Sequence, residues 1–314
     1  MKGLLKRVER AEDGFCVSFD PNDPNALAHM AEFGFCVVKV LSPAECAATR
    51  AEFFHKVNVR TKAMGKEVPV DPADPSTWED ANWPCGKRLV DFPAVSQCAL
   101  TNRTHPNLYQ FYRHLLGTAH VAGNVDVWGV MRGTAMLPGG MPDRPEWRTQ
   151  LPPHWDVNPW WYVEEISAGR PRMYQGVLAL VDCPDETGGL CVAPGSCASL
   201  SAWCDAVPLS HATRANHYDL PPSDPWASCL QHVPIREGEM AVWDSGSLHA
   251  NFPNHGPAMR LVQYVRCSTR ECAESDRLRA AHMPETNAER YGVDLKKLLY
   301  SSKLSRQMMG VVPY

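Results

Sequence analysis

The chain has 314 residues, of which 44% are hydrophobic and 21% are charged. These values are ordinary for a folded globular protein and exclude disorder over most of the chain. Its 31 basic and 35 acidic residues give a formal net charge of −4, and basic residues never occur more than two in a row. The charge pattern therefore argues against a nucleic-acid partner.

Membrane association is not expected either. The chain contains no run of 18 apolar residues, and the apolar stretch near its start, Gly3 to Leu5, is too short for a signal peptide. The twelve cysteines include no CxxC pair, and Cys191, Cys197 and Cys204 lack the spacing of a zinc site. We interpret the cysteines as mostly free thiols and expect a cytoplasmic protein, either a monomer or a homodimer.

Helices are predicted mainly in the first third of the chain. Segment 33–41, FGFCVVKVL, is typical of a β-strand. Directly after it, residues 42–45 form a capping box with Pro43 at the first helical position, which predicts a helix to about Val57. Apolar residues at helical spacing predict a second helix over residues 107–116.

Short apolar strands predominate from residue 125 onward. With 27 Pro and 21 Gly in the chain, these strands alternate with turns and ordered loops, and helices followed by a β-rich half predict a sandwich or barrel braced by helices. We expect a single domain with a helical part at about 1–120, a β core at about 121–270, and a short helix and tail at about 271–314. The predicted strands lie within 125–137, 174–183, 189–196, 239–245 and 260–268.

Two segments of the β-rich half carry a metal-binding pattern. His154 and Asp156 are two residues apart, so on an extended backbone both side chains leave the same face. His249 follows a predicted buried strand, and Arg260 lies eleven residues beyond it. Two His and one carboxylate are the facial triad of non-haem Fe(II) oxygenases. His255 is a rival for the second His, but it lies in the intervening turn and does not have the eleven-residue spacing to the arginine.

The facial triad leaves coordination positions open for a chelating α-keto acid and for O₂. The far carboxylate of such an acid needs a planar and permanently charged partner, which arginine provides better than lysine. Arg260 is the candidate for this role.

These residues stand in a wider pattern that resembles the phytanoyl-CoA dioxygenase-like family of Fe(II)/2-oxoglutarate oxygenases. Residues 33–54 resemble the N-terminal strand and helix of that family, and residues 187–196, TGGLCVAPGS, resemble its turn and PGS segment. Cys197 stands where the family usually has His after PGS. The resemblance covers most of the chain and implies a mainly β fold: a double-stranded β-helix, or jelly roll, with flanking N-terminal helices.

The resemblance also implies roles for individual residues. His154, Asp156 and His249 would bind Fe(II), and Arg260 would bind the 5-carboxylate of the cosubstrate 2-oxoglutarate, with O₂ as the oxidant. Related halogenases have Ala or Gly in place of the aspartate, so Asp156 favours oxygenase chemistry. Hydroxylation of a small molecule with release of succinate and CO₂ is the default reaction, and cyclisation or desaturation are alternatives.

Further cofactor and substrate contacts are predicted less directly. Asn251 and Gln175 are candidates for the 2-oxoglutarate site, as is one of the basic pair formed by Lys87 and Arg88. An aromatic cluster and two arginines near the HxD segment could form a substrate pocket, although packing or solvent exposure explains such residues equally simply. These substrate candidates are Trp155, Trp160, Trp161, Arg170 and Arg172.

Two other readings of the sequence stay open. The first is a cupin-like metal enzyme that does not use 2-oxoglutarate, for which Arg260 would be only a strand charge. The second is a non-catalytic jelly-roll protein that binds or senses a ligand. The intact triad argues against the second reading, because loss of one ligand is the simplest sign of a lost activity.

Overall fold

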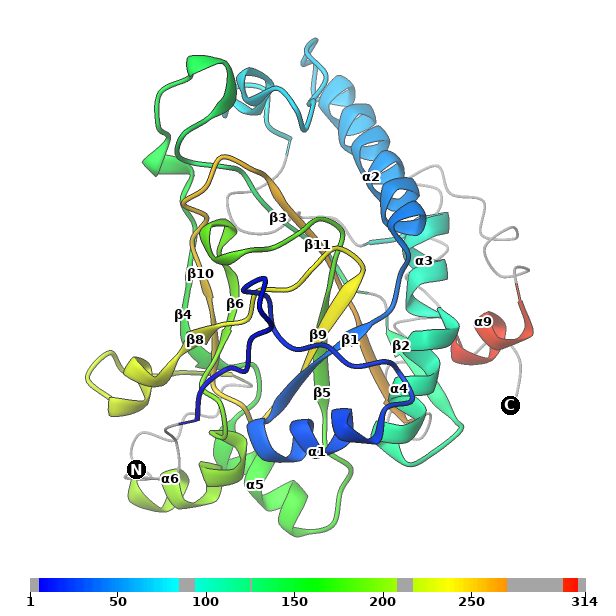
Figure 1. Ribbon diagram of the computed structural model, residues 1–314, viewed down its shortest axis with the longest axis vertical. Coiled ribbons are helices and arrows are strands. Elements are labelled where there is room, and N and C mark those ends of the chain that lie inside the picture. The colour runs from blue at the N-terminus through cyan, green and yellow to red at the C-terminus, as the bar shows by residue number, and fades with distance from the viewer. Residues whose placement is uncertain (1–5, 85–93, 125, 208–216, 270–301, 310–314) are drawn as a thin grey trace.

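The chain forms two antiparallel sheets that pack face to face, with helices on the outside (Figure 1). The computed structural model describes residues 6–84, 94–124, 126–207, 217–269 and 302–309. Within these ranges, both large sheets have five strands and a third sheet has two. The mainly β jelly roll predicted with flanking helices is confirmed. The predicted division at about residues 120 and 270 stays a prediction.

Each large sheet is assembled from strands that are distant in the sequence. The first sheet has the order β1 (Phe35–Lys39), β9 (Glu239–Asp244), β5 (Tyr174–Ala179), β11 (Arg260–Tyr264) and β3 (Trp128–Met131). The second has the order β7 (Tyr218–Asp219), β4 (Leu151–Trp155), β10 (His249–Phe252), β6 (Gly189–Val192) and β8 (Gln231–His232). The small sheet pairs β12 (Arg266–Thr269) with β2 (Val121–Asn124).

The helices confirm the predicted capping signals and add elements that the sequence analysis missed. The capping box of Ser42 and Glu45 is formed, but its helix runs to Ala63, because Thr61 continues the buried stripe beyond Val57. The second predicted helix is confirmed and ends at Gly117, which is left-handed. The α-helices are α1 (Pro24–Phe33), α2 (Pro43–Ala63), α3 (Gln97–Arg103), α4 (Pro106–Leu116), α5 (Pro159–Ser167), α6 (Leu200–Ala206) and α9 (Lys303–Met308).

The missed helices α1 and α5 carry the same starting signal as α2. Asp23 caps α1 before Pro24, and Asn158 caps α5 before Pro159. Helix α5 interrupts the β-rich half, where we expected only strands. None of the helices in the described ranges is long and apolar enough to span a bilayer.

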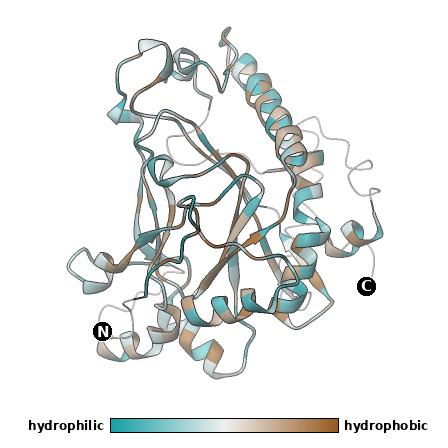
Figure 2. Cartoon of the chain, in the orientation of Figure 1, coloured by the Kyte–Doolittle hydropathy of each residue, from teal (hydrophilic) through white to brown (hydrophobic). Residues whose placement is uncertain are grey.

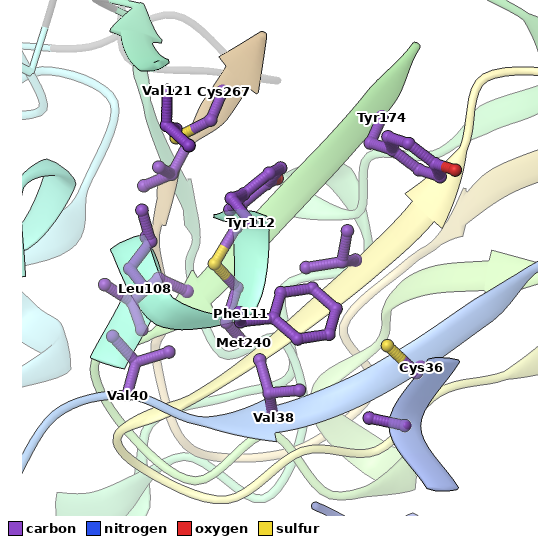
Figure 3. Packing of buried hydrophobic residues seen from close by; sticks show 14 of the residues in the cluster. Cys36, Val38, Val40, Leu108, Phe111, Tyr112, Val121, Tyr174, Met240 and Cys267 are labelled. Carbon is purple, nitrogen blue, oxygen red and sulfur yellow. The ribbon is translucent and has the colours of Figure 1, made fainter. Parts of the chain in front are cut away.

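Helices α2 and α4 cover the outer face of the first sheet. Leu108, Phe111 and Tyr112 of α4 pack on Val38 of β1 and Met240 of β9 (Figure 3). The strands of the first sheet and the covering helices both show brown residues among white and teal ones (Figure 2). Burial of these apolar side chains fixes the sheet against the helices.

The inner faces of the two sheets form a separate core. Val177 and Trp243 of the first sheet pack with Leu190 and Val192 of the second. Because side chains alternate along a strand, Arg260 at the start of β11 lies on the same inward face as Val262. The fold therefore directs a buried arginine into the space between the sheets.

Candidate metal centre

Strand register brings the two predicted histidine ligands together. His154 of β4 is the cross-strand partner of His249, the first residue of β10, and the centroids of their rings lie 4.4 Å apart. Asp156 comes directly after β4 and reaches back to the same point. Its Oδ1 lies 3.5 Å from Nε2 of His154, and its Oδ2 lies 3.3 Å from Nε2 of His249.

The three side chains present a compact set of donor atoms. One ligand atom from each of His154, Asp156 and His249 lies within 4.8 Å of the other two. In the described part of the chain, no other cluster of three or more His, Cys, Asp or Glu ligand atoms is this compact. Cys191, Cys197 and Cys204 therefore form no second centre of this kind.

Backbone carbonyls orient both imidazoles. Nδ1 of His154 lies 2.7 Å from the carbonyl oxygen of Pro152, and Nδ1 of His249 lies 3.1 Å from that of Ser247. A carbonyl only accepts hydrogen bonds, so each Nδ1 carries the proton and donates it. Nε2 is then the nitrogen of each ring that a metal would bind in place of a proton, as in histidine sites with a supporting second hydrogen bond.

Electrostatics keep the carboxylate of Asp156 charged. Burial by itself would raise its pKa, but hydrogen bonds with both histidines hold the pKa well below its usual range. Burial opposes the charged form of His154, yet its hydrogen bonds to Asp156 and to Pro152 raise the pKa of this imidazole. The Asp156 side chain is still 51% exposed, so a metal ion can reach it.

The donor set lines a cavity of about 870 Å³ together with three other predicted cofactor residues. This volume is in the range of small-molecule sites. Arg260, Asn251 and Gln175 all line it, from β11, β10 and β5. Lys87 and Arg88 lie outside the described residues.

Arg260 is buried with unused hydrogen-bonding capacity. The residue is 2% exposed, and its Nε has no hydrogen-bond partner in the described part of the chain. Gly189 leaves room for the guanidinium, because a Cβ on this glycine would lie 2.4 Å from that Nε. A buried cation with a free donor suits an anionic ligand.

Two residues that the sequence analysis missed complete this part of the cavity. Tyr264 lies four residues after Arg260 on the same face of β11 and lines the cavity. The centroid of the Trp243 ring lies 5.3 Å from the centroid of the His249 ring. The period of two along β11, counted from Arg260, was a usable signal for Tyr264.

The predicted substrate residues separate into two groups. Trp155 is fully buried, donates from its indole nitrogen to the carbonyl of Gly246 and packs on Trp203, away from the cavity lining. Trp160 also packs on Trp203 and does not line the cavity. The cavity lining does include Trp161, Arg170 and Arg172.

The rival ligand His255 lies elsewhere. It is exposed in the turn after β10, and its backbone nitrogen donates to the carbonyl of Glu186. It is absent from the cavity lining and from the compact donor set.

Known proteins resemble this chain in sequence and in fold. A Dictyostelium discoideum protein named "Putative phytanoyl-CoA dioxygenase" is 23% identical over 274 residues, which cover 77% of this chain and 74% of that protein. The apo structure of the non-haem monooxygenase ThoJ is 16% identical with a TM-score of 0.50, covering 78% of this chain and 77% of that one. The epimerase SnoN, solved with Fe³⁺, α-ketoglutarate and nogalamycin RO, is 18% identical with a TM-score of 0.50, covering 79% and 85%.

These two structures show the shared fold, and the family is shown by the sequence. The family model Phytanoyl-CoA dioxygenase (PhyH) matches residues 30–262, which is most of the chain. Its members are dioxygenases that require Fe(II) and 2-oxoglutarate, so this protein is an oxidoreductase whose cofactors are Fe(II), 2-oxoglutarate and O₂. The chain belongs to the phytanoyl-CoA dioxygenase (PhyH) family.

Proposed function

We propose that this enzyme hydroxylates a C–H bond of a small-molecule substrate and converts 2-oxoglutarate to succinate and CO₂. In this proposal His154, Asp156 and His249 bind the iron. Arg260 binds the far carboxylate of 2-oxoglutarate. The observation that carries the proposal is one cavity that contains both a compact His–Asp–His donor set and a buried arginine with a free donor.

The donor set suits ferrous iron. Two imidazole nitrogens and one carboxylate oxygen are the ligands that non-haem Fe(II) oxygenases use, and they leave positions for the cosubstrate and O₂. Bound iron supplies the activation of O₂ that C–H oxidation requires. The charged state of Asp156 and the carbonyl-fixed tautomers of the histidines prepare the donors before the metal arrives.

The chain's own residues would orient 2-oxoglutarate. Arg260 offers a fixed charge at the inner end of the cavity, and burial strengthens its interaction with a carboxylate. Asn251 of β10 lines the same cavity and is also buried. The amide nitrogen of Gln175 lies 3.4 Å from the hydroxyl of Ser245, which limits the positions this side chain can take at the cavity wall.

Asp156 also bears on the reaction type. A carboxylate here occupies a position that halide would need in the related halogenases, so oxygenation is favoured over halogenation. Which C–H bond reacts depends on how the substrate lies in the cavity, and cyclisation or desaturation would use the same residues.

An anaerobic titration tests this proposal. Apo-protein is loaded with Fe(II) and then with 2-oxoglutarate, and the visible charge-transfer band of the chelate is recorded for the wild type, His249→Ala and the matched control His255→Ala. We expect the band in the wild type and in the control but not in His249→Ala. A band of normal intensity in His249→Ala would contradict the ligand assignment.

The variant Arg260→Gln distinguishes a 2-oxoglutarate-dependent oxygenase from a cupin-like metal enzyme that does not use 2-oxoglutarate. If Arg260 binds the cosubstrate, this variant should still bind iron but require at least about tenfold more 2-oxoglutarate, as expected for loss of a charge-assisted pair. An unchanged 2-oxoglutarate requirement would favour the metal enzyme that does not use this cosubstrate. Succinate formation measured with candidate substrates then tests the reaction itself.

A further inference from the structure

We propose that Arg172 binds an oxyanion of the substrate, a carboxylate or a phosphate, and that the substrate is an organic acid with an apolar or aromatic body. This inference rests on the proposed oxygenase function, because it concerns the substrate of the same cavity.

A buried carboxylate holds Arg172 in place. Asp244, at the end of β9, has a side chain that is only 4% exposed. It accepts hydrogen bonds from the hydroxyl of Tyr162 at 2.8 Å, from the backbone nitrogen of Gly246 at 2.7 Å and from Nη1 of Arg172 at 2.8 Å. Because three donors hold the Asp244 carboxylate in place, the carboxylate in turn fixes the position of Nη1 of Arg172. Such preorganisation lowers the entropy lost when a ligand binds.

The rest of the guanidinium is available to a ligand. Within the described residues, the hydrogen bonds of Arg172 all involve Nη1, which also lies 3.2 Å from Sγ of Cys197. Burial raises the pKa of the Cys197 thiol to about 12, so this sulfur is neutral at physiological pH. The Arg172 side chain is 45% exposed and lines the cavity. Its Nε and Nη2 therefore provide the donor pair that binds carboxylate or phosphate side-on.

Among the described arginines that line the cavity, Arg172 is the one that an ion pair with a buried carboxylate holds in place. Arg260 and Asp156 belong to the proposed cofactor site. The Nε of Arg170 lies 3.8 Å from Glu165, and the Arg170 side chain is 70% exposed, so it is a weaker anchor. Besides Arg172, the charged residues that line the cavity are Asp126, Asp156, Glu165, Arg170, Arg260 and Arg266.

Apolar side chains in the same cavity lining as Arg172 indicate the body of the substrate. Trp161 is 46% exposed and lines the cavity, together with Val157 and Met173. An exposed indole in the same cavity as a cation suits a ligand with an apolar or planar part and an acidic end. A neutral polar substrate could still accept hydrogen bonds from Nε and Nη2, but without the negative charge that strengthens those of a carboxylate or phosphate.

The test compares three small probes that share a benzene ring: benzoate, phenyl phosphate and the neutral benzamide. Binding is measured by anaerobic titration calorimetry on protein loaded with Fe(II) and saturating 2-oxoglutarate, so that Arg260 is already engaged. We expect at least one of the acids to bind the wild type at millimolar concentration and benzamide to bind much more weakly. In Arg172→Gln, the affinity for the acid should fall at least about tenfold, and in Arg172→Lys it should fall less.

Controls separate this inference from the proposed function and from misfolding. Glutamine at position 172 can still donate to Asp244, and the charge-transfer band should persist in the variant. Arg113→Gln, on the exposed side of α4, removes an equal charge outside the cavity lining and should bind the acid as the wild type does. Equal acid affinity in Arg172→Gln and wild type, equal affinity for acid and amide, or no acid binding at all would overturn the inference. Loss of the band in the wild type would contradict the cofactor assignment instead.

Discussion

The cavity has two walls that are built in different ways. The proposed cofactor wall is made of strands: His154 and His249 are cross-strand partners, and Arg260 begins β11. The substrate wall is made of helix α5 and the loop that follows it, which carries Arg172. Strand pairing fixes side-chain positions through backbone hydrogen bonds, whereas a loop depends on its own side-chain contacts. A jelly roll can therefore keep one cofactor wall and vary the substrate wall.

The largest expected effect is at Asp156, the one carboxylate among the three proposed metal ligands of the cofactor wall. Asp156→Ala should lower turnover by at least about a thousandfold, or about 4 kcal/mol of transition-state stabilisation, because one of the three proposed metal ligands is lost. Succinate release measures the loss of turnover, and iron stoichiometry measures the loss of metal binding. The matched control is Asp219→Asn, a change in the exposed cross-strand neighbour of His154. Turnover within about threefold of wild type in Asp156→Ala would contradict the assignment.

Gly189→Ala tests whether the cofactor wall depends on close packing around Arg260. The new Cβ would lie 2.4 Å from Nε of Arg260, at a backbone φ of +109°. We expect the Michaelis constant for 2-oxoglutarate to rise at least about tenfold and the stability to fall by about 1–3 kcal/mol. Gly117→Ala is the control, since Gly117 has a φ of +65° but no atom within 4 Å of its Cβ position. An equal change of the Michaelis constant in both variants would mean that strain alone is responsible.

The difference between the walls explains how much could be predicted from sequence. His154 and Asp156 were recognisable because alternation along a strand is a short-range rule, and His249 and Arg260 because of their spacing and family resemblance. That His154 would pair with His249 depends on strand register, which follows from long-range packing and is not encoded locally.

The substrate wall was less predictable for the same physical reason. Trp155, Trp160 and Trp161 looked alike in the sequence, yet the end of β4 buries the first and helix α5 places the other two differently. The N-cap Asn158 with Pro159 was a readable signal for α5. The ion pair of Arg172 with Asp244 joins residues 72 positions apart, and no local pattern predicts it.

A substitution at Asp244 sharpens the comparison by disturbing only the substrate wall. In Asp244→Asn the negative charge that holds Arg172 is lost. The new amide NH₂ group also faces a hydrogen-bond donor where the carboxylate had an acceptor. We therefore expect the free energy of unfolding to fall by about 1–3 kcal/mol. Urea unfolding measures it, with the exposed Asp205→Asn on α6 as the control. The Michaelis constant for 2-oxoglutarate should change less than about twofold. A rise comparable to that in Gly189→Ala would show that the walls are not independent.

The smallest effect is expected at Asp185, which attaches the N-terminal segment through Arg10. The carboxylate of Asp185 makes two hydrogen bonds with Arg10 and one with His232. His232 also forms a hydrogen bond with the carbonyl of Gly188, the residue before Gly189, which packs on Arg260. The guanidinium of Arg10, and then His232, lower the pKa of Asp185 to about 2.

Because the folded-state pKa of Asp185 is depressed below its ordinary value of 3.8, its contribution to stability is present above about pH 4 and is lost as the pH falls through about 2. The side chain is 58% exposed, so solvent screening limits this contribution to about 1 kcal/mol or less. Asp185→Asn should therefore lower stability slightly at pH 7 and reduce its decline between about pH 4 and 2. Urea unfolding of both proteins across this pH range provides the measurement. Parallel stability curves would show that the N-terminal attachment contributes nothing to stability through this charge.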